Sequence, residues 1–288
     1  MNLPYCTFHG IRCQVLTCLA AAILLVLCVG CSRTGSFDLT LDFSKVAAVR
    51  YSLDATVHGS ITAEGATRPF ESGARCTLLC AAGPAGARNK GLLQCTVPSA
   101  RFSSTILDSA ELENLGVQSR EVKLTFDTRD ARIAVDDTAS LPLIRIGEWD
   151  VFKDLAATIP ALPKIRVAPG ATWDRERAIP LDIRQGVAVG HLAQSFRLDS
   201  VSQGIKGAQG ARIAMVSWNF TYRIEIRDRD TSASLSRMPS SGKGTGIARI
   251  DVDRRTLESA SMRFSVAAPQ AGAYRISWDE DIALKLAP

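Results

Sequence analysis

Histidine is the side chain most often used for acid–base chemistry near neutral pH, and the chain has only three histidines. His9 falls in the first ten residues, His58 lies on the polar side of an alternating segment, and His191 follows a glycine. None of them stands in a motif with a nucleophile, and the sequence contains no G-x-S-x-G. We therefore expect no catalytic residue, no cofactor and no enzymatic activity.

Two other segments have the residue types of a binding site without its spacing. The stretch SSGKGTG, residues 240–246, lacks the four residues that a P-loop places between its first glycine and its Gly-Lys pair. We interpret it as a flexible loop before a hairpin. The acidic residues Asp279–Asp281 are consecutive, whereas calcium ligands alternate along a longer loop, so they predict a solvated turn and no metal site.

Three cysteines fall in the segment ARCTLLCAAGPAGARNKGLLQCTVP, residues 74–98, which has the pattern of a strand, a glycine-rich loop and a second strand. A turn centred near residues 87–88 places Cys80 opposite Cys95 across the hairpin. We therefore predict a Cys80–Cys95 disulfide, with Cys76 left over. The spacing does not fit a zinc site, and no histidine lies near in the sequence.

The N-terminus combines Arg12 with an uncharged apolar run over residues 15–30, a pattern typical of a secretory signal. A transmembrane helix needs about 20 apolar residues, slightly more than this run supplies. The run ends in LCVGC, residues 27–31, which resembles the lipobox of bacterial lipoproteins, with Cys28 where leucine is usual. The resemblance implies cleavage before Cys31 and its modification with acyl chains such as palmitate, which would anchor the chain without spanning the bilayer. An uncleaved signal anchor is the alternative.

The residue after the lipidated cysteine bears on location. An aspartate at this position often retains lipoproteins in the inner membrane, so Ser32 favours the outer membrane. We expect a lipid-anchored protein of the cell envelope, with the periplasmic and the outer face both left open. Export to this compartment also permits the disulfide.

Alternation of apolar and polar residues dominates the rest of the chain, most clearly over residues 49–61 and 214–226. Such alternation is typical of antiparallel strands with one buried and one solvated face. We predict a mainly β fold built on large, curved antiparallel sheets, as a half-barrel or a sandwich. The formal charge of +5 is not gathered into a basic block with interleaved aromatics, so nucleic acid is not expected as a partner.

One or two short amphipathic helices are expected, over residues 148–158 and, more weakly, 103–116. The chain divides into a signal peptide (1–30), a lipidated tether (31–36), a β-rich first half (37–140), a junction punctuated by prolines (141–170) and a β-rich second half (171–288). Residues 123–131 and 249–257 align, which indicates that the halves are related. In each, an aspartate (Asp127, Asp253) is placed to accept bonds from turn amides.

The junction resembles uncharacterised families of secreted bacterial lipoproteins, in which a helix leads to a proline, a short basic-apolar strand, a glycine and a tryptophan. Here these are Pro163, residues 164–167, Gly170 and Trp173, and the resemblance extends to the hairpin at 247–262. It implies an envelope β-protein without a stated activity. The architecture is also similar to envelope lipid carriers of the LolA and LppX kind, which fold a long antiparallel sheet around a helix and an apolar cavity.

The large apolar residues on one side of the long strands suggest a cradle for an apolar ligand such as lipid. The candidate ligand-binding residues are Trp149, Phe152, Trp218, Phe220, Tyr222 and Phe264. The same residues could instead be core alone. Two further functions stay open: a structural or assembly lipoprotein that binds another envelope protein, and, less favoured, an outer-membrane β-barrel. Aromatic residues are only 6% of the chain, which disfavours the barrel.

Overall fold

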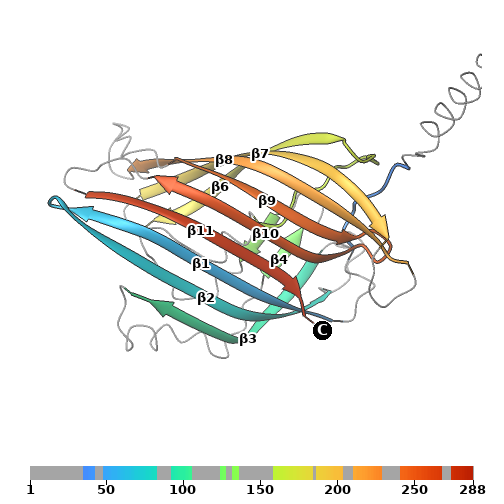
Figure 1. Cartoon of the computed structure of the whole chain (residues 1–288), viewed down its shortest axis with the longest axis horizontal. Coiled ribbons are helices and arrows are strands. Elements are labelled where there is room, and N and C mark those ends of the chain that lie inside the picture. The colour runs from blue at the N-terminus through green and yellow to red at the C-terminus, as the bar shows by residue number, and fades with distance from the viewer. Residues whose placement is uncertain are drawn as a thin grey trace, which may run out of the picture. The chain divides into compact units, whose positions relative to one another are not determined.

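The computed structural model describes residues 35–42, 48–82, 92–105, 124–127, 132–135, 158–183, 186–203, 210–228, 241–267 and 274–287. The strands are β1 (Val49–Ala63), β2 (Ala66–Ala82), β3 (Leu92–Ser104), β4 (Leu124–Asp127), β5 (Arg132–Val135), β6 (Thr172–Ile183), β7 (Gly186–Gln203), β8 (Arg212–Asp228), β9 (Ser241–Asp251), β10 (Thr256–Ala267) and β11 (Tyr274–Leu286) (Figure 1). All eleven belong to one sheet, and every neighbouring pair is antiparallel. The prediction of a mainly β, antiparallel fold is confirmed.

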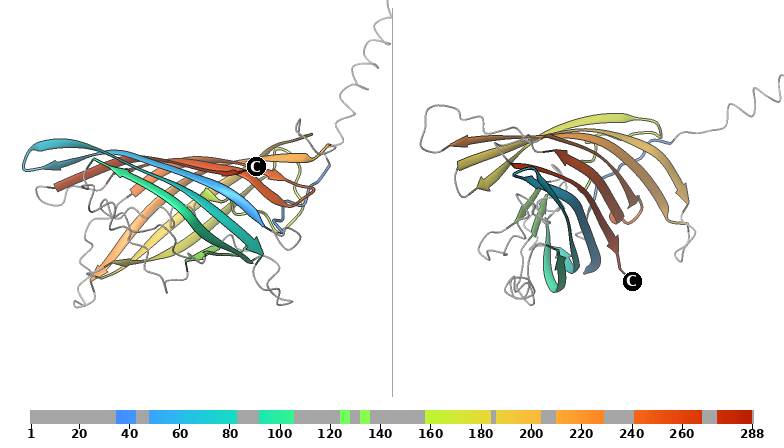
Figure 2. Two further views of the ribbon diagram at one scale, coloured as in Figure 1. Left: turned by 90° about the horizontal axis from the view of Figure 1, so that it is seen from below. Right: turned by 60° about the vertical axis from the view of Figure 1, so that its left-hand side comes forward.

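The first and last strands lie side by side in the middle of the sheet. The strand order is β5-β4-β3-β2-β1-β11-β10-β9-β8-β7-β6, so β1 pairs with both β2 and β11. The two predicted β-rich segments therefore contribute to a single sheet, with β1–β5 on one side and β6–β11 on the other. Among the described strands the sheet is open, with β5 and β6 at its ends, and Figure 2 shows it strongly curved and twisted.

The alternation seen in the sequence separates a buried from a solvated face. On β1, Tyr51, Leu53 and Val57 are buried, and their neighbours in sequence are partly or fully exposed. The solvated face carries cross-strand ion pairs, such as Arg75 with Asp54. Most buried apolar side chains of the strands belong to one hydrophobic cluster, as expected of antiparallel strands with one wet face.

Two segments outside the strands also belong to this cluster. The first segment, residues 35–42, contributes Leu39 and Leu41. The second, residues 158–171, contributes Ile159, Ala161, Leu162 and Val167. Backbone hydrogen bonds in both directions join Phe37 to Val167, and Nε1 of Trp173 donates to the carbonyl oxygen of Ala161 at 2.7 Å. The two segments are thus held to each other, and the second is also held to β6.

The glycine-rich stretch is not a loop. Residues 241–246 form the first half of β9, so the prediction of a flexible loop is wrong. Three glycines of β9 pair with three aromatic residues of β8: Gly242 with Tyr222, Gly244 with Phe220, and Gly246 with Trp218.

Steric room explains why these positions are glycine. A Cβ atom on Gly244 would collide with the ring of Phe220, and one on Gly246 would collide with the ring of Trp218. The two rings therefore lie over the bare backbone of β9. Aromatic residues are known to cover glycines in sheets in this way, and the pairing offsets the weak intrinsic preference of glycine for strands.

The acidic run is not a solvated turn either. Asp279, Glu280 and Asp281 lie inside β11, where they alternate between faces. Asp281 pairs with Arg263 at 2.6 Å and Asp279 accepts from Ser265, both on the solvated face. Glu280 points to the buried face and its side chain is fully buried.

In the turn between β9 and β10, the aspartate that accepts the turn amides is not the one predicted from the sequence. Oδ1 of Asp251 accepts the turn amides of Asp253 and Arg254 at 3.0 and 2.8 Å. Asp253 instead accepts the backbone N–H of Arg212 at 2.8 Å and forms an ion pair with its guanidinium. The capping aspartate is thus two residues earlier than expected.

The predicted helices lie mostly outside the described residues. Of the 148–158 helix, only Thr158 is described. The weaker helix cannot begin at residue 103, because Ser103 and Ser104 still belong to β3. Over the described ranges, no helix is both long and apolar enough to cross a membrane.

Because Trp218 lies over Gly246, we expect replacement of this glycine by alanine to lower the stability of the protein and not to raise it. At an unconstrained strand position, Gly→Ala stabilises by about 0.5–1 kcal/mol. We expect Gly246→Ala to destabilise by about 1–3 kcal/mol, because the added methyl displaces a buried ring. Urea unfolding of the variant, of Trp218→Leu and of the double variant measures this. The double variant should recover part of the loss, and a stability gain in Gly246→Ala alone would contradict the contact.

Candidate ligand-binding face

Four of the six predicted ligand-binding residues lie on the buried face of the sheet. Trp218 and Phe220 of β8 and Phe264 of β10 are buried, and Tyr222 of β8 is half-buried. The other two, Trp149 and Phe152, lie outside the described residues. The strands therefore bring together the four predicted residues that can be placed.

Contacts between rings extend this set across five strands. Phe220 and Phe264 lie 6.1 Å apart between ring centroids, although β9 separates their strands. Their approach is possible because the residue between them in register is Gly244. On the other side, the ring of Phe196 lies 5.8 Å from Trp218 and stacks at 5.6 Å on Trp173.

We call these six residues the aromatic face. Its members are Trp173, Phe196, Trp218, Phe220, Tyr222 and Phe264. The sequence prediction of ligand-binding residues missed Trp173 and Phe196. Phe196 could have been found from its place in the alternation of β7, because it is the register partner of Trp218. Trp173 has no such signal, because its position depends on how the edge strand β6 pairs.

The exposure of the buried face increases along the strands. Near the β9–β10 turn, Leu198 and Val216 have no exposed surface. Phe220 and Phe264, farther along, are 5% and 7% exposed. One residue pair nearer the β1–β2 turn, Tyr222 and Trp278 are half-buried, as is Ile61 beyond them. Val266 and Phe70 in the same row are buried, at 3% and 5% exposed, so solvent reaches this end of the apolar surface at some of its side chains only.

One transverse row of the buried face contains polar side chains. In register from β7 to β2 it runs through Gln194, Phe220, Gly244, Phe264, Glu280, Val57 and Ser72. Gln194 is 2% exposed and Glu280 is 0% exposed. Ser72 is satisfied by donating to Ser104 at 2.9 Å. The sequence prediction missed this polar row, because a single polar residue at a buried position does not break an alternating pattern.

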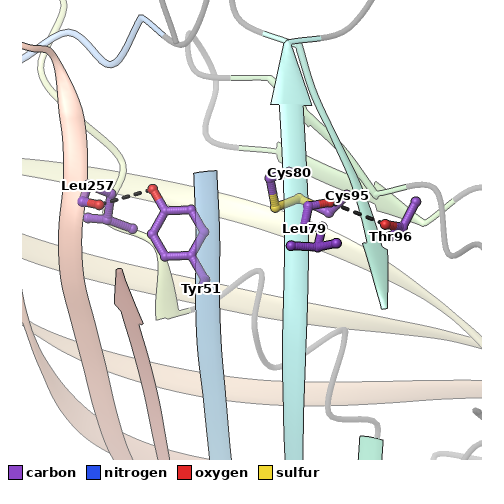
Figure 3. Close-up of a disulfide and its surroundings, with 6 residues drawn as sticks. All are labelled: Tyr51, Leu79, Cys80, Cys95, Thr96 and Leu257. Carbon is purple, nitrogen blue, oxygen red and sulfur yellow. Dashed lines mark hydrogen bonds between the residues drawn. A yellow bond between two sulfur atoms is a disulfide. The ribbon is translucent and has the colours of Figure 1, made fainter. Parts of the chain in front are cut away.

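The disulfide is formed by the pair that the sequence predicts. Cys80 of β2 and Cys95 of β3 are register partners, and their sulfur atoms are bonded (Figure 3). Cys76 is buried and free. Burial, with a smaller contribution from the charge of Asp54, raises the pKa of the Cys76 thiol to about 11. This thiol is therefore protonated at neutral pH, which makes it a poor nucleophile.

Besides the disulfide, a side-chain hydrogen bond links two strands in the middle of the sheet. The hydroxyl of Tyr51 on β1 donates to the carbonyl oxygen of Leu257 on β10 at 3.0 Å (Figure 3). Burial raises the pKa of the Tyr51 phenol, so the group remains a donor at any physiological pH. This bond reaches over β11, which lies between the two strands.

The candidate acid–base and metal residues do not converge on the aromatic face. His58 lies on the solvated face, with Nδ1 3.8 Å from Oε2 of Glu71. His191 is exposed. Within the described ranges, no three of the residues His, Cys, Asp and Glu gather as a metal site would require. Cys31, the predicted lipidation site, lies outside the described residues.

Comparison with known proteins identifies no family. No protein-family model matches the chain, and no curated protein matches it. Among solved structures, the chain is similar to lipovitellin, in a structure described as showing lipid–protein interactions in lipovitellin. The TM-score is 0.44 and the sequence identity is 11%, and the match covers 86% of this chain and 26% of the lipovitellin chain. The translocator domain of autotransporter NalP from Neisseria meningitidis is similar at a TM-score of 0.17 and 8% identity, over 98% and 99%. The chain thus spans about a quarter of lipovitellin, and neither likeness carries an argument about function.

The cross-link between β2 and β3 leads to a stability prediction. A disulfide closing a 15-residue loop restricts the unfolded chain by about 3 kcal/mol. We expect the Cys80→Ala/Cys95→Ala double variant to lose a free energy of unfolding of this order. Chemical denaturation under non-reducing conditions measures it, and adding a reductant to the wild type should reproduce it.

The free thiol supplies the control for that experiment. Because Cys76 is buried and protonated, a thiol reagent such as dithionitrobenzoate should not modify it in the folded protein at pH 8. It should react once the chain is unfolded. Rapid labelling of Cys76 under native conditions would contradict its burial.

Proposed function

We propose that this chain is a lipid-anchored protein of the bacterial envelope that binds an apolar ligand, such as a lipid, on the aromatic face of its sheet. The proposed role is binding or carriage rather than catalysis. The proposed anchor is Cys31, and the proposed location is the outer membrane.

One observation carries the proposal: the apolar face of the sheet extends beyond the part that the rest of the chain covers. Tyr222, Trp278 and Ile61 continue this face while remaining partly exposed to solvent. Large apolar side chains at the margin of a core cost free energy in water unless another apolar surface covers them. An acyl chain lying along the strands would cover them and continue onto Phe220 and Phe264.

The curvature of the sheet and the glycines of β9 also support the proposal. Because β9 has no side chains at 242, 244 and 246, the face is shallow there and the neighbouring rings form its floor. Flat rings offer a long, smooth apolar surface, which suits a flexible hydrocarbon chain better than a globular head group. Ring edges and faces also contribute dispersion contacts along the whole chain.

The anchor follows from the N-terminus and is supported by the disulfide. A Cys80–Cys95 bond is stable in an exported protein and would be reduced in the cytosol. Acyl chains on Cys31 would place the sheet next to a membrane, where lipids are available.

The test of ligand binding is to purify the full chain from membranes in mild detergent and extract it with organic solvent. We expect mass spectrometry of the extract to show lipid at about one molecule per chain. Tyr222→Glu, which places a charge at the half-exposed margin, should lower the lipid recovered. Thr221→Glu on the solvated face is the matched control. Protein partners without extractable lipid would indicate an assembly role instead.

The test of the anchor is metabolic labelling with an alkyne analogue of palmitate. Cys31→Ser should abolish the label and move the protein from the membrane to the soluble fraction. Cys28→Ser, three residues away in the same segment, should keep both. Label in Cys31→Ser, or its loss in both variants, would contradict cleavage before Cys31.

A further inference from the structure

The aromatic face contains polar atoms that a pure hydrocarbon could not satisfy. Gln194 on β7 is 2% exposed, and neither its Oε1 nor its Nε2 has a hydrogen-bond partner in the part of the chain that the structure describes. Nε1 of Trp218 on β8 is also buried without a partner there. The amide of Gln194 alone has two N–H donors and one carbonyl acceptor.

The two groups lie on opposite sides of β8. Gln194 belongs to β7 and is the register partner of Phe220 on β8. The indole of Trp218 lies over Gly246 of β9, with Nε1 2.7 Å from the position that a Cβ atom of Gly246 would occupy. The amide of Gln194 is therefore the group that a ligand head would contact.

An amide left unsatisfied in such a place is costly. A buried donor or acceptor without a partner destabilises the folded protein, whereas leucine would pack at the same position without this penalty. Buried polar atoms are therefore paired in nearly all structures, with protein, water or ligand. A residue that is unfavourable for the core alone is expected where it contacts a ligand.

The chemistry of this amide specifies the head group. The two N–H donors require an acceptor oxygen, and Oε1 of Gln194 requires a donor. A carbonyl oxygen beside a hydroxyl supplies both. Arg175 and Arg177 lie half-buried on the same face of β6, in register with Gln194 and Leu192, and their charge favours oxygen-rich heads over ammonium heads.

We propose that the ligand is an acyl lipid with a carbonyl oxygen next to a hydroxyl, and that this head group binds Gln194. The inference rests on the proposed function and specifies the class of lipid. The protonated carboxyl group of a fatty acid and the glycerol end of a monoacylglycerol both have this chemistry, whereas an ionised carboxylate has no donor for Oε1. The head lies in the polar row, one residue pair from the half-exposed end, and the acyl chain lies along the strands, over Phe220 and Tyr222 of β8.

The experiment uses the full chain in lipid nanodiscs and a long-chain fatty acid with a photoreactive diazirine in its tail. Irradiation should attach the probe to residues of β7, β8 or β10, as located by peptide mass spectrometry. Unlabelled oleic acid, monoolein, methyl oleate and octadecane then compete with the probe. Oleic acid or monoolein should compete at about tenfold lower concentration than methyl oleate, because the ester lacks the hydroxyl, and octadecane should compete least.

Variants test whether Gln194 makes this distinction. Gln194→Leu should remove the tenfold preference and leave the midpoint of urea unfolding unchanged or higher. Gln203→Leu, an exposed glutamine on the same strand, is the matched control and should keep the preference.

The outcomes separate this inference from the proposed function. A stronger effect of oleic acid or of monoolein identifies which source supplies the head. Equal competition by methyl oleate or octadecane, or a preference that survives in Gln194→Leu, would overturn the head-group assignment while leaving lipid binding intact. Absence of probe from all three strands would overturn the proposed function itself.

Discussion

The close approach of aromatic rings to a glycine strand is the contact on which the buried face depends. Trp218 and Phe220 occupy the space where side chains at Gly246 and Gly244 would otherwise be. Since β9 contributes no side chain there, Phe220 reaches Phe264 across it, and a second series of ring contacts joins Trp173, Phe196 and Trp218 on β6, β7 and β8. Glycine and ring must alternate in register on the two strands, which ties the sequence of β9 to that of β8.

This dependence also explains which parts of the fold could be predicted from the sequence. The alternation at 49–61 and 214–226 correctly predicted β1 and β8, because each strand carries its own apolar side chains. The same rule failed at 241–246, where the apolar surface of the strand comes from its neighbour. It failed at Glu280 as well, because three adjacent acids look solvated unless the strand through them is known. A strand whose packing comes from another strand cannot be predicted by reading one segment at a time.

The order of the strands is still harder to predict from the sequence. The tie from Tyr51 to Leu257 joins residues 206 positions apart, and β1 finds its neighbour in β11 at the other end of the chain. Only the local hairpins, including the one with the disulfide, follow from spacing. Closing the centre of the sheet between distant strands requires ordering a long stretch of chain, which favours slow folding relative to local hairpins.

The polar row distinguishes two interpretations of the same apolar face. If the face were a core and nothing else, each of its positions would be best filled by an apolar side chain, and the amide of Gln194, which has no partner among the described residues, would destabilise it. Gln194 lies one residue pair from the row of Leu192 and Tyr222, which is apolar. The rows on its other side, through Trp218 and Val216, are apolar on β7 and β8 as well. A polar amide between apolar rows matches an acyl lipid whose head binds there and whose chain lies along the strands, and it is an arrangement that a core alone has no reason to keep.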